Sequence, residues 1–439
     1  MPESIDSLIH AEWIIPVVPE NRVLEKHSLA IQGGRIHDIL PTLQARQKYQ
    51  TGHELALAGQ ALIPGLINAH THAAMSLLRG LADDLPLMTW LNDYIWPAEG
   101  KWVNEEFVHD GSQLAIAEML LGGTTCFNDM YFFPDVTARA ADAAGIRAMV
   151  GLIAIDFPSA WAADADDYLH KGLEVHDQFR GNNLIHTAFA PHAPYSVADS
   201  LLERVRVYAD ELEIPIHIHL HETNDEIVQG LQQHGNRPMQ RLQELGLLSP
   251  SLLGVHMTHL AEGEIEQFAI AGGHAVHCPE SNLKLASGFC PVHALQRAGV
   301  NVALGTDGAA SNNDLDMFSE MRTAALLAKG VARDASALPA AHALSMATIN
   351  GARALGLADE IGSLEIGKSA DLLAVDLNSL HTQPVYHPIS QLVYATGHEQ
   401  VSHVWVAGRQ LVNRGELTTL DRQEILARTA DWRNRIAAE

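Results

Sequence analysis

The middle of the chain alternates short apolar runs with segments of helical spacing. Eight apolar runs have the length and composition of strands, and they cover 61–72, 123–130, 147–155, 184–196, 214–223, 252–260, 273–282 and 300–310. Between them, apolar positions recur at helical intervals, and several of these segments end in glycine, as helices commonly do. Eight strand–helix repeats predict an α/β fold, a (β/α)8 barrel of TIM type rather than an open doubly wound sheet.

Both ends of the chain show a different pattern of apolar and polar positions from this middle segment. "LIHAEWIIPVV" and "HSLAIQGGRIHDIL" are apolar and partly alternating, and Gly33-Gly34 interrupts the second run as a tight hairpin does. "SADLLAVDL" and the segment after it show the same short strands near the C-terminus. We therefore expect a small β-sandwich built from residues 1–61 and 365–439, the latter with a terminal helix, around a catalytic barrel of residues 62–364.

Polar residues gather at the C-terminal ends of the apolar runs, where (β/α)8 enzymes place their chemistry. His70 and His72 lie two residues apart, so both imidazoles face the same side of a strand and can approach one ion. A histidine of the fifth run and Asp307 near the end of the eighth would complete four N/O ligands. Nitrogen-rich ligation favours zinc or iron over magnesium or calcium. The fourth run has no lysine that could bridge two metals, which predicts one divalent ion per subunit.

The fifth run, "IPIHIHLHET", offers three candidates for the third histidine ligand. His217, His219 and His221 share strand parity, so parity alone does not identify the ligand. Glu222 follows His219 by three residues, just past the strand, where a carboxylate can approach a bound water without ligating the ion. This spacing favours His219 as the ligand and Glu222 as a proton shuttle. His217 is then expected deeper in the barrel and His221 at its rim.

Composition and charge narrow the class of protein further. The 439 residues carry 28 basic and 53 acidic side chains, a formal net charge of -25, which argues against nucleic acid and anionic membrane as partners. The three cysteines, Cys126, Cys278 and Cys290, form no C-x-x-C pair, which indicates a reducing compartment and excludes a cysteine-built zinc site. We find no signal-peptide pattern and no apolar run of transmembrane length, so we expect a cytoplasmic protein.

Taken together, these motifs resemble those of the amidohydrolase superfamily. "PGLINAHTHAAMSLLRGLADDLPLMTWL", "HIHLHET" and "LGTDGAASNNDLDM" are most similar to the 5'-methylthioadenosine/S-adenosylhomocysteine deaminases within it. The likeness extends from the N-terminal β segment to "GSLEIGKSADLLAVD", so it covers nearly the whole chain. The resemblance implies a metal held by His70, His72, His219 and Asp307, and a homo-oligomer, dimer or larger.

The resemblance also implies a reaction, the hydrolytic deamination of an adenosine-type nucleoside at C6. Glu222 would protonate the purine N1 and so make C6 electrophilic, while Asp307 would accept the proton of the attacking water. His256, the first histidine of "GVHMTH", matches the position that stabilises charge on the attacking oxygen. His259, the second, is the weaker match because it falls further into the following loop.

Substrate contacts follow from the same resemblance. Glu99 in "WPAEGKW" matches a carboxylate that accepts hydrogen bonds from ribose hydroxyls, and His192 in "APHAPYS" matches a substrate-contacting histidine. Relatives that accept S-adenosylhomocysteine place arginines after the third run, but "LIAIDFPSAWAADADDYLHKG" contains none and carries Phe157, Pro158 and Trp161. Apolar surface suits a thioether and not a carboxylate. We therefore expect 5'-methylthioadenosine to be preferred, with S-adenosylhomocysteine and adenosine slower.

Two other functions are compatible with the same site residues. Deaminases of guanine or cytosine and chlorohydrolases of triazines share the metal set and Glu222, and Glu99 discriminates because a free base has no ribose. A catalytically silent barrel, acting as a binding or scaffold protein, would be expected to lack a ligand or the shuttle, and none is missing here.

Overall fold

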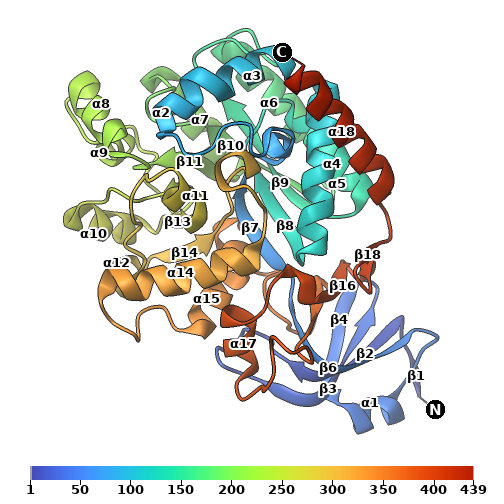
Figure 1. Cartoon of the computed structure of the whole chain (residues 1–439). Helices are drawn as coiled ribbons and strands as arrows, with labels where there is room; N and C mark the ends of the chain where they lie inside the picture. Colours follow the sequence, from blue (N-terminus) through green and yellow to red (C-terminus); the bar gives the residue numbers. More distant parts are fainter. Residues whose placement is uncertain (1, 439) are drawn as a thin grey trace.

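Eight parallel strands form a barrel in the middle of the chain (Figure 1). The structure is a computed structural model that describes residues 2–438. The barrel strands are β7 Leu66–Thr71, β8 Thr124–Asp129, β9 Arg147–Ala154, β10 Ile185–Pro191, β11 Ile216–Leu220, β12 Leu252–His256, β13 His274–His277 and β14 Asn301–Leu304. Each strand pairs with the next one along the chain. This order confirms the predicted (β/α)8 architecture.

The first and last barrel strands meet at the residues expected to hold a metal. The main-chain N–H of Asp307 donates to the carbonyl of His70 at 3.0 Å, just beyond the end of β14. Gly305 lies so close to β7 that a Cβ on it would stand 2.8 Å from the backbone nitrogen of His70. Glycine at 305 therefore permits the approach that brings the two strand ends together.

Helices surround the barrel and cover its outer face (Figure 1). They are α4 Glu105–Leu121, α5 Pro134–Ala144, α6 Ala165–Phe179, α7 Asp199–Leu212, α8 Asn224–His234, α9 Pro238–Glu244, α10 Glu262–Ala271, α11 Pro279–Lys284, α12 Val292–Arg297, α13 Ala309–Asn312, α14 Met317–Ala332, α15 Ala340–Met346 and α16 Ile349–Ala354. Two further helices, α2 Leu87–Trp90 and α3 Trp96–Trp102, are joined by a π-helical turn and lie in the long connection between β7 and β8. None of the helices within residues 2–438 has the length and apolar composition of a membrane span.

Strands from both ends of the chain form a second sheet beside the barrel (Figure 1). In spatial order it contains β18 Glu416–Leu417, β17 Arg409–Asn413, β16 Val401–Val406, β15 Leu372–Asp376, β6 Glu54–Pro64, β2 Ser7–Ile14, β3 Leu24–Gln32 and β4 Arg35–Pro41. The turn between β3 and β4 contacts the segment before β15, where the Ala370 N–H donates to the Gly34 carbonyl at 2.9 Å. The prediction of a small β-domain built from both termini is thereby confirmed. Smaller elements complete it: β1 Glu3–Ser4, β5 Tyr49–Gln50, α1 Thr42–Lys48 and α17 Pro388–Tyr394.

A buried ion pair connects the second sheet to the barrel. Arg147, at the start of β9, places Nε 3.0 Å from Oδ2 of Asp371, which directly precedes β15. Both side chains are almost fully buried, and Asp371 also accepts the main-chain N–H of Ala407 at 2.8 Å. The terminal helix α18, Arg422–Ala437, runs along α4 of the barrel (Figure 1). There the indole N–H of Trp432 donates to Asp110 at 3.0 Å.

Candidate metal centre and active-site cavity

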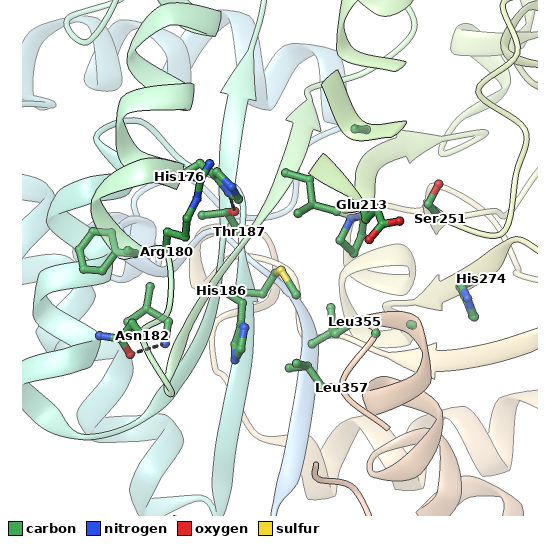
Figure 2. Close-up of a pocket in the computed structure, with 18 of the residues that line it drawn as sticks. His176, Arg180, Asn182, His186, Thr187, Glu213, Ser251, His274, Leu355 and Leu357 are labelled. Carbon is green, nitrogen blue, oxygen red and sulfur yellow. Dashed lines mark hydrogen bonds between the residues drawn. The ribbon is translucent and has the colours of Figure 1, made fainter. Parts of the chain in front are cut away.

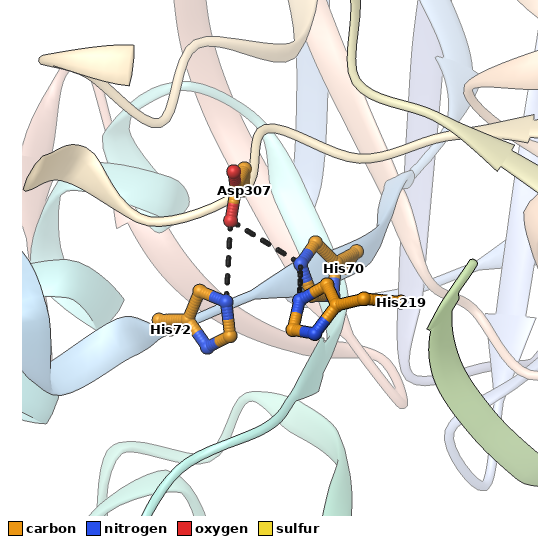
Figure 3. A group of neighbouring side chains, drawn as sticks. All are labelled: His70, His72, His219 and Asp307. Atoms are coloured by element: carbon orange, nitrogen blue, oxygen red, sulfur yellow. Dashed lines mark hydrogen bonds and ion pairs between the residues drawn. The ribbon is translucent and has the colours of Figure 1, made fainter. Parts of the chain in front are cut away.

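Three histidines and one aspartate converge at the C-terminal end of the barrel (Figure 3). One ligand atom of each of His70, His72, His219 and Asp307 lies within 4.8 Å of the others. Oδ1 of Asp307 is 3.2 Å from Nε2 of His70 and 3.3 Å from Nε2 of His72. The Nε2 atoms of His70 and His219 are 3.2 Å apart. The structure thus brings together all four residues that the sequence suggested as ligands.

The outer nitrogens of two of these histidines are fixed by main-chain carbonyls. Nδ1 of His72 lies 2.6 Å from the Met130 oxygen, and Nδ1 of His219 lies 2.8 Å from the His192 oxygen. A carbonyl accepts only a hydrogen, so each Nδ1 carries a proton, and Nε2 is the nitrogen that faces the common centre. Three imidazole nitrogens and one carboxylate oxygen are a donor set that would suit a divalent ion such as zinc.

Burial and the Asp307 carboxylate set the protonation of this cluster. Burial lowers the pKa of His70 to about 4, and it lowers the pKa of His219 well below the ordinary value. Burial would raise the pKa of Asp307, but hydrogen bonds and charge from His70 and His72 hold it well below its usual range. Asp307 is therefore ionised, as a metal ligand must be.

The other two histidines of the fifth strand turn out to differ from each other. His217 is fully buried in the barrel, and its Nε2 lies 2.9 Å from Nδ1 of His70, so it packs behind that ligand. His221 follows the end of β11 and has a left-handed φ of 55°, which turns its ring away from the cluster. There its Nε2 accepts the main-chain N–H of Met239 at 3.0 Å. His221 is fully buried in this position beyond the end of the strand.

Glu222 and His256 face each other beside the cluster. Nε2 of His256 lies 3.9 Å from Oε2 of Glu222, and Nδ1 of His256 lies 2.8 Å from Oδ1 of Asn282. Burial raises the pKa of Glu222, which favours a carboxyl group that retains a proton. His259 lies elsewhere: its Nε2 is 2.7 Å from the Ser287 carbonyl oxygen, and it does not line the cavity over the cluster.

A cavity of about 520 Å³ opens above the cluster and receives every other sequence-predicted site residue. Partly buried Glu99 lines it, and the hydroxyl of Tyr131 donates to Oε1 of Glu99 at 2.7 Å. His192 also lines it, with Nδ1 2.9 Å from Oγ of Ser196, and burial lowers the pKa of His192 to about 3. Besides the metal cluster, the cavity therefore holds a neutral imidazole, that of His192, and the acidic side chain of Glu99.

Much of the remaining wall of this cavity is apolar. Met88, Trp90 and Trp96 come from the α2–α3 segment, and Phe157 and Pro158 come from the connection between β9 and α6. Within residues 2–438, no arginine or lysine lines the cavity.

Sequence reasoning missed part of this wall. It did not assign Tyr131, Trp90 or Trp96 to the site, and it expected Trp161 to offer apolar surface to the substrate. Trp161 instead packs against Tyr168, with ring centroids 5.6 Å apart, and does not line the cavity. Trp90 and Trp96 lie in "LPLMTWLNDYIWPAEGKW", a segment rich in aromatic residues that also contains Glu99. This enrichment is the sequence feature that could have indicated their place in the cavity wall.

A second cavity, of about 680 Å³, lies at the opposite end of the barrel (Figure 2). It is lined at the N-terminal ends of the strands by residues such as His186, Pro215, Ser251 and His274. The cluster of Figure 3 lies at the other end of the barrel, where the C-terminal strand ends meet. Catalytic groups of (β/α)8 enzymes sit at that C-terminal end, so the smaller cavity is the candidate active site despite its size.

Comparison with known sequences agrees with this geometry. The sequence model of the amidohydrolase family matches residues 61–411, which include the metal cluster and Glu222. The chain belongs to the amidohydrolase family.

Two curated relatives are similar to the chain over nearly its whole length. The chain is 55% identical over 436 residues to a 5-methylthioadenosine/S-adenosylhomocysteine deaminase of Teredinibacter turnerae, and the match covers 99% of each chain. It is 52% identical to a protein of the same name from Saccharophagus degradans, across 99% of this chain and 97% of that one.

Solved structures resemble the chain along its whole length. A crystal structure of an adenosine deaminase from Xanthomonas campestris with bound zinc superposes with a TM-score of 0.99, at 54% identity and with complete coverage of both chains. An atrazine chlorohydrolase from Arthrobacter aurescens, complexed with zinc, gives a TM-score of 0.91 at 24% identity, covering 97% of this chain and 99% of that one. At that identity the chlorohydrolase shows a shared fold only.

Proposed function

We propose that this protein hydrolytically deaminates the adenine ring of 5'-methylthioadenosine, giving 5'-methylthioinosine and ammonia. One observation carries the proposal: Glu222 and Glu99 line a single cavity that opens on the cluster of His70, His72, His219 and Asp307. The relatives named as 5-methylthioadenosine/S-adenosylhomocysteine deaminases support the same substrate class.

The cluster is suited to one divalent ion per subunit, zinc in our proposal and iron as the alternative. Such an ion would supply Lewis-acid activation of water near neutral pH. The protein's own groups then move the protons. Glu222, whose pKa burial raises, donates to the purine N1, and this makes C6 electrophilic. Asp307 accepts the proton that the attacking water loses, because its carboxylate is ionised and faces the same space.

His256 and the two acids complete the reaction. As the water oxygen bonds to C6, His256, 3.9 Å from Glu222, stabilises the negative charge that develops on that oxygen. The proton taken up by Asp307 passes to the exocyclic nitrogen, the C6–N bond breaks, and ammonia leaves. The N1 position keeps the proton from Glu222, and the proton of the C6 hydroxyl returns to that carboxylate, so water is consumed and the 6-oxo purine forms.

Glu99 and His192 would bind the ribose and its neighbourhood. The Glu99 carboxylate keeps an oxygen free beside the one that accepts from Tyr131, and a vicinal pair of hydroxyls can donate to it. His192 is neutral, because burial lowers its pKa to about 3, so its imidazole can form a hydrogen bond with the neutral nucleoside.

The wall that remains for the 5' substituent favours a methylthio group. Met88, Phe157 and Pro158 offer apolar contacts to a thioether, and Asp156 is a nearby acid of the same cavity. The tail of S-adenosylhomocysteine would bring a carboxylate to a cavity that no arginine or lysine lines within residues 2–438. An ion lacking one charge-assisted partner loses roughly tenfold in binding or more, so we place S-adenosylhomocysteine as a slower substrate. Adenosine is also placed as slower, because its 5' hydroxyl lacks the thioether that the apolar wall contacts.

The second candidate, an amidohydrolase acting on a free base or a triazine, has the same fold and metal residues. It would leave the Glu99 carboxylate and its Tyr131 hydrogen bond without a ribose to bind. We also propose a cytoplasmic homo-oligomer, dimer or larger, that binds no nucleic acid, with the barrel of residues 62–364 between segments 1–61 and 365–439.

Ammonia release from a substrate panel tests the proposal. The zinc-loaded protein is incubated with 5'-methylthioadenosine, S-adenosylhomocysteine, adenosine, guanine, cytosine and a chlorinated triazine, and kcat/KM is measured for each. We expect the highest value for 5'-methylthioadenosine. A higher kcat/KM for S-adenosylhomocysteine contradicts the preference, and turnover confined to free bases or triazines contradicts the substrate class.

A further inference from the structure

Glu226 is a buried acid next to the proposed shuttle, and none of the roles above uses it. Its side chain is 4% exposed, and its two oxygens accept main-chain N–H groups from consecutive residues. Oε1 accepts from His221 at 2.8 Å, and Oε2 accepts from Glu222 at 2.8 Å. One carboxylate therefore holds both peptide units that lead into Glu222.

The local sequence explains how Glu226 reaches this position. Thr223 is the N-cap of α8, and its hydroxyl accepts the Glu226 N–H at 3.3 Å. A glutamate at the third helical position commonly returns to the N–H of its own N-cap residue. Here it extends past the N-cap to the two residues before it, because His221 adopts a left-handed φ of 55° and turns both N–H groups toward the helix.

A second group fixes the other side of the same loop. The hydroxyl of Thr258 lies 2.6 Å from the Glu222 carbonyl oxygen, and the Thr258 N–H donates to the His221 carbonyl at 3.0 Å. Glu226 thus holds the N–H side of residues 221 and 222, and Thr258 holds the carbonyl side. The Glu222 backbone has little freedom to shift relative to the metal cluster.

We propose that Glu226 is a positioning residue for proton transfer, and that it fixes the backbone from which Glu222 reaches the purine N1. This inference rests on the proposed deaminase function. A displacement of about 1 Å at a reacting group can cost on the order of 100-fold in rate, so loosening this clamp should slow catalysis strongly. It should not weaken metal binding, because Glu226 contacts none of the four ligands through the bonds that it makes.

A purely structural role would have a different signature. If Glu226 only stabilised the start of α8, its loss would lower the melting temperature and the amount of folded protein, but each folded molecule would turn over normally. If it positions Glu222, folded and metal-loaded protein should show a lower kcat with little change in KM, because binding of the ribose and thioether involves other walls of the cavity.

Glu226→Gln is the main variant, and Asp225→Asn is the matched control. Glutamine preserves size but turns an amide N–H toward one of the two main-chain N–H groups, so one bond of the clamp is lost. Asp225 is an exposed acid in the same first turn of α8. Its replacement by asparagine makes the same change from carboxyl to amide without touching the loop. We expect kcat to fall roughly 10- to 100-fold in Glu226→Gln, with KM within about threefold and zinc content unchanged, and Asp225→Asn to match the wild type.

Transition-state affinity provides a readout that folding does not move. An inhibitor that mimics the tetrahedral C6 adduct should lose affinity for Glu226→Gln in proportion to kcat/KM, whereas the 6-oxo product should bind as to the wild type. Should Glu226→Gln not fold, Glu226→Asp decides, because it keeps the carboxyl group but is one methylene too short to hold both N–H groups.

The outcomes separate this inference from the function on which it rests. If the wild type releases ammonia and the glutamine and aspartate variants turn over like it, the positioning role is wrong while the deaminase proposal stands. Equal loss of affinity for the product and for the transition-state mimic would likewise overturn it. If the wild type itself releases no ammonia from 5'-methylthioadenosine, the proposed function fails first.

Discussion

Replacement of Glu99 by glutamine tests the ribose contact in isolation from the chemistry. Tyr131 donates to Oε1 of Glu99 at 2.7 Å, so the other carboxylate oxygen is the one available to a ribose hydroxyl. Glutamine keeps one oxygen acceptor and replaces the other by an amide N–H, which removes one charge-assisted hydrogen bond. Such a bond contributes about 1.5–3 kcal/mol. At 1.36 kcal/mol per factor of ten, kcat/KM for 5'-methylthioadenosine should fall roughly 10- to 150-fold.

The assay compares two nucleosides on two proteins. Loss of the adenine ultraviolet absorbance gives kcat/KM for 5'-methylthioadenosine and for its analogue without the 2' and 3' hydroxyls. The analogue should react equally with the wild type and with Glu99→Gln, since it has no hydroxyl to lose. Asp93→Asn, an exposed acid on the same segment, is the control for charge alone. A loss below about threefold on the natural nucleoside, or an equal loss on the analogue, would show that Glu99 does not bind the ribose hydroxyls.

Three further predictions concern stability and metal binding. Arg147→Met should lower the free energy of unfolding by about 3–5 kcal/mol in urea denaturation, because it leaves Asp371 buried and unpaired, and the double variant with Asp371→Leu should recover part of it. A loss below about 1 kcal/mol contradicts this. Burial lowers the pKa of His277 to about 3, so its contribution to stability is present above about pH 6.5 and is lost as pH falls toward 3. His277→Asn should flatten the decline on acidification by up to about 1.4 kcal/mol per pH unit, and an unchanged slope contradicts it. Chelation should lower the melting temperature of the wild type but not that of Asp307→Asn.

The ligands at the strand ends could be predicted from the sequence because polar residues follow apolar strand residues within each short segment. His70-x-His72 and the polar residue at 307 follow apolar runs directly, and in a parallel barrel all such ends meet on one face. The fold then converts a one-dimensional pattern into the cluster of Figure 3. Parity predicted that His217 and His219 share a face, and both indeed approach His70.

Other features depend on contacts that no local pattern encodes. His221 departs from strand parity because the chain leaves β11 with a positive φ, and that conformation is stabilised by Glu226 and Met239 from two later helices. Glu226 itself looks in sequence like a solvated acid at a helix start. The sequence predicted Trp161 in the cavity wall, but its side chain packs against Tyr168 and does not line the cavity. The division of the chain at 61 and 365 stays a prediction.

The most direct test of the account compares the wild type with Glu222→Gln, both loaded with zinc. The wild type should hold one zinc per chain and release one ammonia for each 5'-methylthioadenosine converted to 5'-methylthioinosine. Glu222→Gln should hold the same zinc, because Glu222 is not in the ligand cluster, and lose nearly all turnover. Substantial turnover in Glu222→Gln, or a zinc-loaded wild type that releases no ammonia, would contradict the account.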